Sequence, residues 1–282
     1  MDTIGTQQLL SFKSGATQIG KVDCTSIRKD AGVPVTSYLE LARFIAELQY
    51  RNREHVLLFR GQSNDYRNAQ RNTTLKPSLF RPLGKNNPSQ AELQRRFDIL
   101  DQAERLLVHE YGSAGLLGRE RVERLRIVRW SILQHYEICG TPLLDVTHSL
   151  RIAASFASHG AVGKAYVFVL GVPSLGGGIS ASAEASLQTV RLSSVCPPDA
   201  LRPHLQEGYL LGEYPDIAAI DQKSLYRHYE VDFGRRLVAK FCFDPGTFWK
   251  SSAFPLVSKR ALYPAPKEIG RASCRERVCY VV

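Results

Sequence analysis

The sequence lacks any apolar run close to the ~20 residues that a membrane-spanning helix needs. It also opens, at Met1-Asp2-Thr3, without the basic and apolar pattern of a secretory signal, so we expect none. The chain has 6 cysteines, and none of them form a C-x-x-C pair, which favours reduced thiols over a disulfide framework. These absences predict a cytoplasmic protein with no membrane association.

Several motifs of common chemistries are also absent. The sequence contains no G-x-x-x-x-G-K-[ST], G-x-G-x-x-G, G-x-S-x-G or H-E-x-x-H pattern. Gly176-Gly177-Gly178 has no neighbouring lysine and no strand–helix context, so we interpret it as a flexible loop. His135 and Cys139 are spaced like two zinc ligands on a helix, but no second pair accompanies them, and we predict no metal site.

What the chain does contain is an ordinary globular composition with a basic balance. Its 282 residues are 44% hydrophobic and 23% charged, and the formal net charge is +10. A basic protein can bind nucleic acid, nucleotide phosphates or an acidic partner. Arginines do crowd one segment, but on a helix they would surround it rather than form one stripe, so we interpret them as a solvated face; they are Arg119, Arg121, Arg124, Arg126 and Arg129.

Local patterns predict a mixture of helices and strands. Capping boxes at Ser37–Glu40 and Ser89–Glu92 each open an amphipathic helix, and a third helix is expected over 119–135. Ala153, Ala154 and Ala157 predict a short helix that approaches a sheet closely, capped by Thr147 or Ser149. Strands are expected around 56–59, 143–146, 165–170, 188–194, 207–212 and 235–243, and loops over 64–87 and 175–186.

Helices concentrated early and strands late favour an α+β fold over alternating βαβ units. The predicted architecture is a small mixed sheet flanked by helices, with helical N-terminal decoration. Residues 1–35 are weakly patterned and are interpreted as an N-terminal extension. The last residues, 269–282, resemble a translated sequencing adapter and are interpreted as an artefact tail without chemistry, the alternative being a genuine disordered basic tail.

Phe59-Arg60-Gly61-Gln62 is the most informative stretch, because it follows an apolar strand directly. The glycine permits close backbone approach, and the guanidinium offers a fork of donors that suits phosphate or carboxylate. Asp145 lies inside another apolar run, where an acid needs a partner. An Arg60–Asp145 pair would serve either a binding site or the fold, and His135 is interpreted first as a core histidine.

Three further blocks accompany this stretch in order. They are Lys76-Pro77-Ser78-Leu79-Phe80-Arg81, then Gln134-His135-Tyr136 with Thr141-Pro142-Leu143-Leu144-Asp145-Val146-Thr147, and finally Pro198, Arg202, Gln206, Gly208 and Tyr209. Together the blocks resemble the FRG domain, a family named for its (Phe/Tyr)-Arg-Gly motif. We assign 36–268 to an FRG-like domain, although Val146 stands where the family has tryptophan and Gly140-Thr141-Pro142 replaces an expected Pro-Thr-Arg run.

A fainter resemblance is to the ADP-ribosyltransferase pattern, which implies that NAD is the substrate. By that resemblance Arg60 contacts the phosphates or the nicotinamide ribose, Thr147 takes the pocket-forming serine position, and Gln206 falls near the catalytic glutamate. A neutral Gln206 cannot supply that charge, and Glu207 would face the other way on a strand. The remaining candidate ligand-binding residues are Gly61, Gln62, His135, Asp145, Gly208 and Tyr209.

The resemblances imply an effector that binds a nucleotide, NAD above all, and that acts as a toxin or anti-phage ADP-ribosyltransferase-like enzyme on a protein or nucleic-acid target. Two alternatives stay open. One is a non-catalytic module that senses a phosphorylated ligand through Arg60. The other, which depends only on the charge, is a nucleic-acid-binding module.

Overall fold

The computed structural model describes residues 4, 9–16, 18–82, 84, 87–115, 117–174, 176–196, 201–224, 231–250 and 253–263. The tail 269–282 and Pro198 lie outside these residues. The chain is α+β, as predicted, with strands of a mixed sheet flanked by helices. It divides into two compact units: the first combines Met1–Leu75, Val146–Gly176 and Asp232–Tyr263, and the second combines Lys76–Asp145 with Gly177–Val231.

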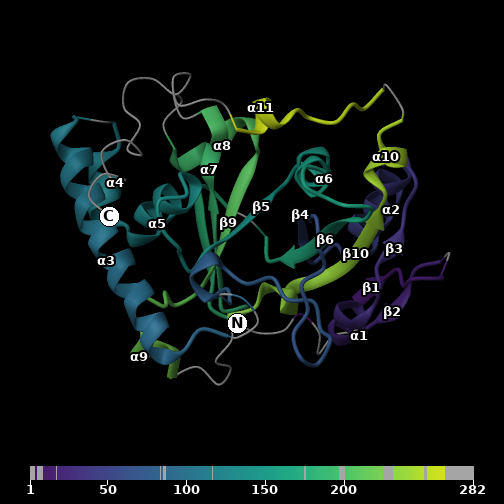
Figure 1. Cartoon of the computed structure of the whole chain (residues 1–282), viewed down its shortest axis with the longest axis horizontal. Helices are drawn as coiled ribbons and strands as arrows, with labels where there is room; N and C mark the ends of the chain where they lie inside the picture. The colour runs from purple at the N-terminus through teal and green to yellow at the C-terminus, as the bar shows by residue number, and fades with distance from the viewer. Residues whose placement is uncertain are drawn as a thin grey trace. The chain divides into compact units, whose positions relative to one another are not determined.

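The first unit is built on the strand order β3-β10-β6-β4-β5, in which β4, β6 and β10 are antiparallel neighbours (Figure 1). The short β3 pairs in parallel with β10, and a separate hairpin of β1 and β2 lies before it in the chain. These strands are β1 (Leu9–Ser11), β2 (Gly20–Val22), β3 (Val33–Pro34), β4 (Val56–Gln62), β5 (Leu144–Thr147), β6 (Ala165–Val172) and β10 (Leu237–Phe243).

The helices of the first unit cover both sides of this sheet. α6 packs on β4 and β6, and α1 packs on β10. Phe44 of α2 stacks on Phe241 of β10, with the ring centroids 5.8 Å apart. The helices are α1 (Cys24–Lys29), α2 (Tyr38–Arg51), α6 (Leu150–Ser158), η2 (Phe233–Arg236), α10 (Pro245–Phe248) and α11 (Lys259–Leu262).

Register divides the central strands into two faces, because successive side chains alternate and cross-strand partners share a side. The first, which we call the helical face, carries Phe59 and Gly61 of β4 and lies under α6. The second, which we call the arginine face, carries Arg60 and Gln62 of β4, together with their partners Phe168 and Tyr166 of β6 and with Lys240 and Cys242 of β10.

The second unit contains three antiparallel strands in the order β9-β8-β7 and a group of helices. The strands are β7 (Ile179–Ser182), β8 (Leu187–Arg191) and β9 (Gly208–Glu213). The helices are η1 (Ser78–Phe80), α3 (Gln90–Ser113), α4 (Arg119–Arg124), α5 (Arg126–His135), α7 (Leu192–Val195), α8 (Leu201–Leu205) and α9 (Ile220–Ser224).

One buried acid holds the helices of this unit together. Glu104 of α3 is 6% exposed and accepts hydrogen bonds from Arg126 at 3.2 Å, Arg129 at 2.7 Å and the Trp130 indole at 2.7 Å. The interpretation of this arginine cluster as a solvated face is therefore wrong for Arg129, whose side chain is 14% exposed, while Arg126 stays 41% exposed. Both guanidiniums neutralise a carboxylate that would otherwise be costly to bury.

Both predicted capping boxes are confirmed at their serines, since Ser37 and Ser89 each accept a hydrogen bond from the backbone N–H three residues later. Other predictions were wrong in detail. The expected helix over 119–135 is broken at Leu125, the expected loop over 175–186 contains β7, and β8 ends at Arg191, where α7 begins. Strands are also interleaved with helices from the start of the chain, because the N-terminal segment supplies β1, β2 and β3.

Candidate functional site

Gly61 is the residue that lets α6 approach β4. A Cβ atom at this position would lie 1.7 Å from the carbonyl oxygen of Ala153 and 2.8 Å from the backbone nitrogen of Ala157. The small side chains of α6 serve the same contact, since Ala153, Ala154 and Ala157 are fully buried. Gly61 therefore has a structural role, and the expectation that this helix approaches the sheet closely is confirmed.

Arg60 and Gln62 project from the opposite side of β4, onto the arginine face. Arg60 is half-buried and pairs with Phe168, while Gln62 pairs with Tyr166. The rings of Tyr166 and Phe168 are nearly parallel, with their centroids 6.1 Å apart. Gln62 Oε1 is buried and has no hydrogen-bond partner among the described residues. A buried amide oxygen without a donor is unusual and marks a position where an N–H or O–H would be stabilised.

Thr147 does not share the side of Arg60. The register pairs Thr147 with Phe59, so the threonine lies on the helical face. Its hydroxyl oxygen accepts the backbone N–H of Ser149 at 3.0 Å, in the turn that begins α6. The resemblance implied that Arg60 and Thr147 contribute to one pocket, but the register places their side chains on opposite faces of the sheet, because a single register step separates the two sides of a strand.

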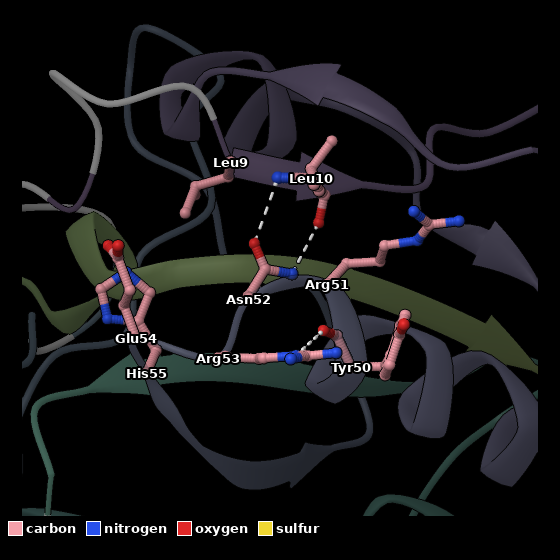
Figure 2. A pocket seen from close by; sticks show the side chains of 8 residues that line it. All are labelled: Leu9, Leu10, Tyr50, Arg51, Asn52, Arg53, Glu54 and His55. Atoms are coloured by element: carbon pink, nitrogen blue, oxygen red, sulfur yellow. Dashed lines mark hydrogen bonds between the residues drawn. The ribbon is translucent and has the colours of Figure 1, made fainter.

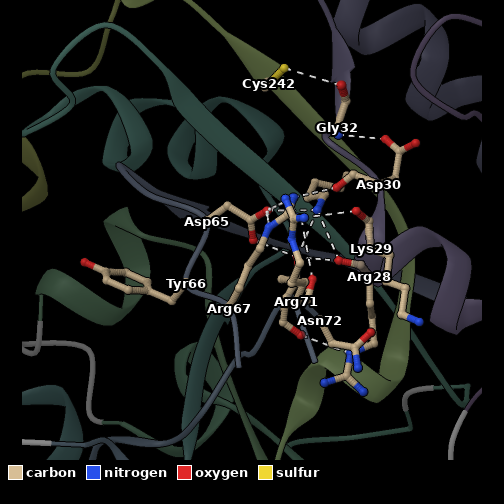
Figure 3. Close-up of polar contacts among 12 residues, drawn as sticks. Arg28, Lys29, Asp30, Gly32, Asp65, Tyr66, Arg67, Arg71, Asn72 and Cys242 are labelled. Carbon is tan, nitrogen blue, oxygen red and sulfur yellow. Dashed lines mark hydrogen bonds and ion pairs between the residues drawn. The ribbon is translucent and has the colours of Figure 1, made fainter. Parts of the chain in front are cut away.

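A polar network anchors the loop after Gln62 over the arginine face. The Lys240 side chain is 1% exposed, and its ammonium donates to Asp65 Oδ2 at 2.9 Å and to Thr73 Oγ1 at 2.9 Å. Burial lowers the pKa of Lys240, and the Asp65 carboxylate opposes that shift. Arg67 also pairs with Asp65, and it donates to the carbonyls of Lys29 and Asp30 at the end of α1 (Figure 3).

The motif residues of the second unit form a network of their own. Gln134 donates from Nε2 to Asp145 Oδ2 at 2.6 Å, and its Oε1 accepts from Ser78 at 3.0 Å and from Thr141 at 2.6 Å. The Ser78 hydroxyl in turn accepts the backbone N–H of Thr141. Blocks that lie far apart in the sequence thus meet at one amide, and the acid in the apolar run has a hydrogen-bonding partner. An Arg60–Asp145 pair stays a prediction.

His135 is a buried neutral histidine. It is 5% exposed, and burial together with the nearby Arg202 charge lowers its pKa to about 3. Its Nε2 atom has no hydrogen-bond partner among the described residues, and its ring meets Tyr136 edge-on at 5.6 Å. With such a pKa the imidazole is neutral near pH 7, so in this environment it can form hydrogen bonds but is not the imidazolium that a general acid requires.

Gln206 lies in the turn between α8 and β9, not on a strand. Its backbone N–H bonds to the carbonyl of Arg202, and Glu207 follows with a φ of 45°. The prediction that alternation along a strand separates Gln206 from Glu207 is therefore wrong. Gly208 and Tyr209 begin β9, where a Cβ at Gly208 would lie 2.9 Å from Leu192, so this glycine allows close packing.

Sequence reasoning quoted Gln134 in a motif block without giving it a role, and it missed Asp65 and Lys240. A charged residue inside an apolar strand was the signal that identified Asp145, and Lys240 in Leu-Val-Ala-Lys-Phe-Cys-Phe carries the same signal. Among the described residues, no group of three or more His, Cys, Asp or Glu side chains could hold a metal ion. In the same part of the chain, no helix has the length and apolarity to cross a membrane.

Comparison with known proteins identifies one family. The family model of the FRG domain matches residues 55–164, which run from the start of β4 past the end of α6. No curated protein and no solved structure matches the chain.

Proposed function

The chain carries an FRG domain at residues 55–164, and from that premise we propose that it binds a nucleotide, NAD in the first instance, through the arginine face of β4. The proposed role is that of a cytoplasmic effector, a toxin or anti-phage protein with ADP-ribosyltransferase-like chemistry. The nucleotide, the enzyme class and the role come from the resemblances described above; the geometry of the first unit supports the choice of site.

The unsatisfied Gln62 Oε1 is the observation that carries the proposal. It lies two positions from Arg60 on the same side of the same strand, about 7 Å along the backbone. A guanidinium suits phosphate, while an amide oxygen suits the amide N–H₂ or a ribose hydroxyl of the same ligand. Tyr166 of β6 is the cross-strand partner of Gln62, and its ring supplies an aromatic surface for a base or nicotinamide ring.

Each candidate residue then has a different part. Arg60 and Gln62 contact the ligand, while Gly61 and Thr147 hold α6 in place behind them. By the ADP-ribosyltransferase resemblance alone, Gln206 takes the position near the catalytic glutamate, where a neutral amide cannot stabilise the positive charge that develops on the sugar. Turnover should therefore be slow or absent while binding is intact, which is also the behaviour of the non-catalytic alternative.

The test is a titration of the purified protein with NAD by calorimetry, together with chromatographic measurement of free nicotinamide. Arg60→Lys keeps the charge but loses the bidentate fork, so we expect saturable binding to disappear while the thermal midpoint is kept. Arg105→Lys is the matched control, because Arg105 is 71% exposed and its ion pair is with Asp101 on its own helix. Wild-type affinity in Arg60→Lys would refute the assigned role of Arg60.

Gln206→Glu separates the enzyme from the binding module. If Gln206 lies at the sugar, a carboxylate should raise nicotinamide release by about a hundredfold, the size of a well-placed electrostatic contribution. Flat turnover in Gln206→Glu, with undiminished binding in Gln206→Ala, would refute the ADP-ribosyltransferase analogy and leave the sensing module.

A further inference from the structure

A cavity of about 550 Å³ lies in the first unit, between β1 and the end of α2, and no motif described above contributes to it (Figure 2). It is lined by Leu9, Leu10, Tyr50, Arg51, Asn52, Arg53, Glu54 and His55. This volume is within the usual range for small-ligand pockets.

Asn52 fixes the walls of this cavity in place. Its side chain accepts the backbone N–H of Leu10 at 3.1 Å and donates to the Leu10 carbonyl at 2.8 Å, so the amide pairs with β1 as a further strand residue would. The same residue is the C-cap of α2, and its Nδ2 also donates to the Leu48 carbonyl at 2.9 Å. The end of the helix and the hairpin strand are therefore held together before any ligand arrives, which lowers the entropic cost of binding.

Positive charge surrounds one end of the cavity. Arg51 and Arg53 line it directly, and Lys21 stands opposite Leu10 in the hairpin register, on the same side of the hairpin as that lining residue. In the described part of the chain, none of these three exposed cations forms an ion pair. Figure 2 shows Glu54 beside His55 at the other end of the group, away from Tyr50 and Arg51.

An exposed aromatic ring lies among these cations. Tyr50 is 63% exposed, and the guanidinium carbons of Arg53 and Arg51 lie 4.4 Å and 5.8 Å from its ring centroid. Arg53 is oriented by a hydrogen bond from its Nε to the Tyr50 carbonyl at 3.1 Å. Cation–π contacts with Tyr50 alone would account for the orientation of Arg51 and Arg53. They do not explain why a cavity lies beside the ring or why a third unpaired cation, Lys21, stands opposite Leu10.

We propose that single-stranded nucleic acid binds at this surface, with a base stacked on Tyr50 and backbone phosphates held by Arg51, Arg53 and Lys21. Aromatic rings interleaved with unpaired cations are the combination by which proteins hold single strands without reading their sequence. Leu9 and Leu10 contribute the apolar part of the lining, and the net charge of +10 attracts polyanions from a distance. An acidic peptide would use the cations but has no need of the exposed ring.

The surface is separate from the nucleotide site proposed above. His55, at the far end of the cavity lining, precedes Arg60 by five residues along the extended β4, a separation of about 16 Å. The inference therefore does not depend on NAD binding, and it gives a location to a nucleic-acid interaction that the charge alone could only suggest.

The experiment measures fluorescence anisotropy of a labelled 12-nucleotide oligo(U) and oligo(dT) titrated with the full chain at several salt concentrations. Tyr50→Ala should weaken binding about tenfold, and Tyr50→Phe should restore it, since stacking needs the ring and not the hydroxyl. Replacing Arg51 and Arg53 with glutamine should lower the slope of log affinity against log salt by about 1.4, for two phosphate contacts.

The matched control replaces Arg121 and Arg124 with glutamine, which removes the same charge from two exposed arginines of α4. If that control weakens binding as much as the Arg51/Arg53 pair does, or if Tyr50→Ala binds as the wild type does, binding is diffuse and the proposal fails. Equal affinity for a labelled polyglutamate peptide, with the same dependence on Tyr50, would also overturn it in favour of an acidic partner. Thermal midpoints within about two degrees of wild type confirm that each variant is folded.

Discussion

Replacing Gly61 with alanine should destabilise the protein by forcing α6 away from β4. The added Cβ atom would lie 1.7 Å from the Ala153 carbonyl oxygen and 2.7 Å from its carbonyl carbon. Ordinary contact for such a pair begins near 3.4 Å, so the backbone of α6 would have to move by about 1.7 Å. No rotamer change can relieve the clash, because the atoms that it meets belong to the backbone.

The cost follows from what that movement disrupts. α6 buries Ile152, Ala153, Ala154 and Ala157 against the sheet, and overpacking a well-packed interior typically costs about 1–3 kcal/mol. Because a whole helix must move, we expect a loss of about 3 kcal/mol or more in the free energy of unfolding. For a chain of this size that corresponds to a fall of roughly 6–12 °C in the thermal midpoint.

The assay is urea and thermal denaturation of Gly61→Ala beside Gly20→Ala. Gly20 is the control because a Cβ there meets nothing within 4 Å, so its replacement should be neutral or slightly stabilising. The double variant Gly61→Ala/Ala153→Gly should gain nothing, since the clash is with a carbonyl group. A midpoint within 2 °C of wild type for Gly61→Ala, or rescue by Ala153→Gly, would refute the packing argument.

Two further predictions concern the second unit. Gln134→Ala should lower the free energy of unfolding by about 2–4 kcal/mol, because Ser78, Thr141 and Asp145 each lose a hydrogen-bonding partner. The control Gln94→Ala, on an exposed face, should change it by less than about 0.5 kcal/mol. Equal effects of the two substitutions in urea denaturation would contradict the network. His135 has a folded pKa of about 3, below its ordinary 6.5, so its contribution to stability is complete above pH 6.5 and is lost as pH falls toward 3, at up to about 1.4 kcal/mol per pH unit. The free energy of unfolding of wild type minus that of His135→Leu, measured in urea at each pH, should therefore fall from pH 7 to pH 4, and a constant difference would contradict a buried neutral imidazole.

Local signals in the sequence predicted local structure well. The serine caps of α2 and α3 and the apolar faces behind them depend on residues three or four apart, which a short window contains. The run of alanines in α6 likewise indicated a close approach to a sheet, and Gly61 is the surface that the helix meets. Such features require no knowledge of which strands pair.

The features that were missed depend on distant pairing. Thr147 and Arg60 lie on opposite sides because Phe59 is the partner of Thr147, and no local pattern fixes that register. Lys240 and Asp65 are 175 residues apart in the chain, so their ion pair is invisible until β10 and the loop after β4 are placed. β7 was not predicted because its sequence, Ile-Ser-Ala-Ser, is only weakly apolar. The strand forms through its pairing with β8, which no local pattern indicates.

The structure also separates motif residues that the fold explains from those that it does not. Packing accounts for Gly61, and hydrogen bonding accounts for Ser78, Gln134 and Thr141, so their place in the motif blocks needs no ligand. Gln62 Oε1 and His135 Nε2 are different, because neither atom has a hydrogen-bond partner among the described residues. Burying a polar atom in this way destabilises the folded state.

A bound ligand is one source of the missing hydrogen bond at such an atom. In the first unit that reasoning points to Gln62, beside Arg60, as the place to look for bound ligand. Gln62→Leu removes the unsatisfied oxygen while keeping the volume, so it should leave the fold as stable as wild type or more stable. If Gln62 binds ligand, Gln62→Leu should keep or raise the free energy of unfolding, whereas a structural role predicts that the substitution lowers it. This difference in sign makes Gln62 a sharper probe of this site than the arginine beside it.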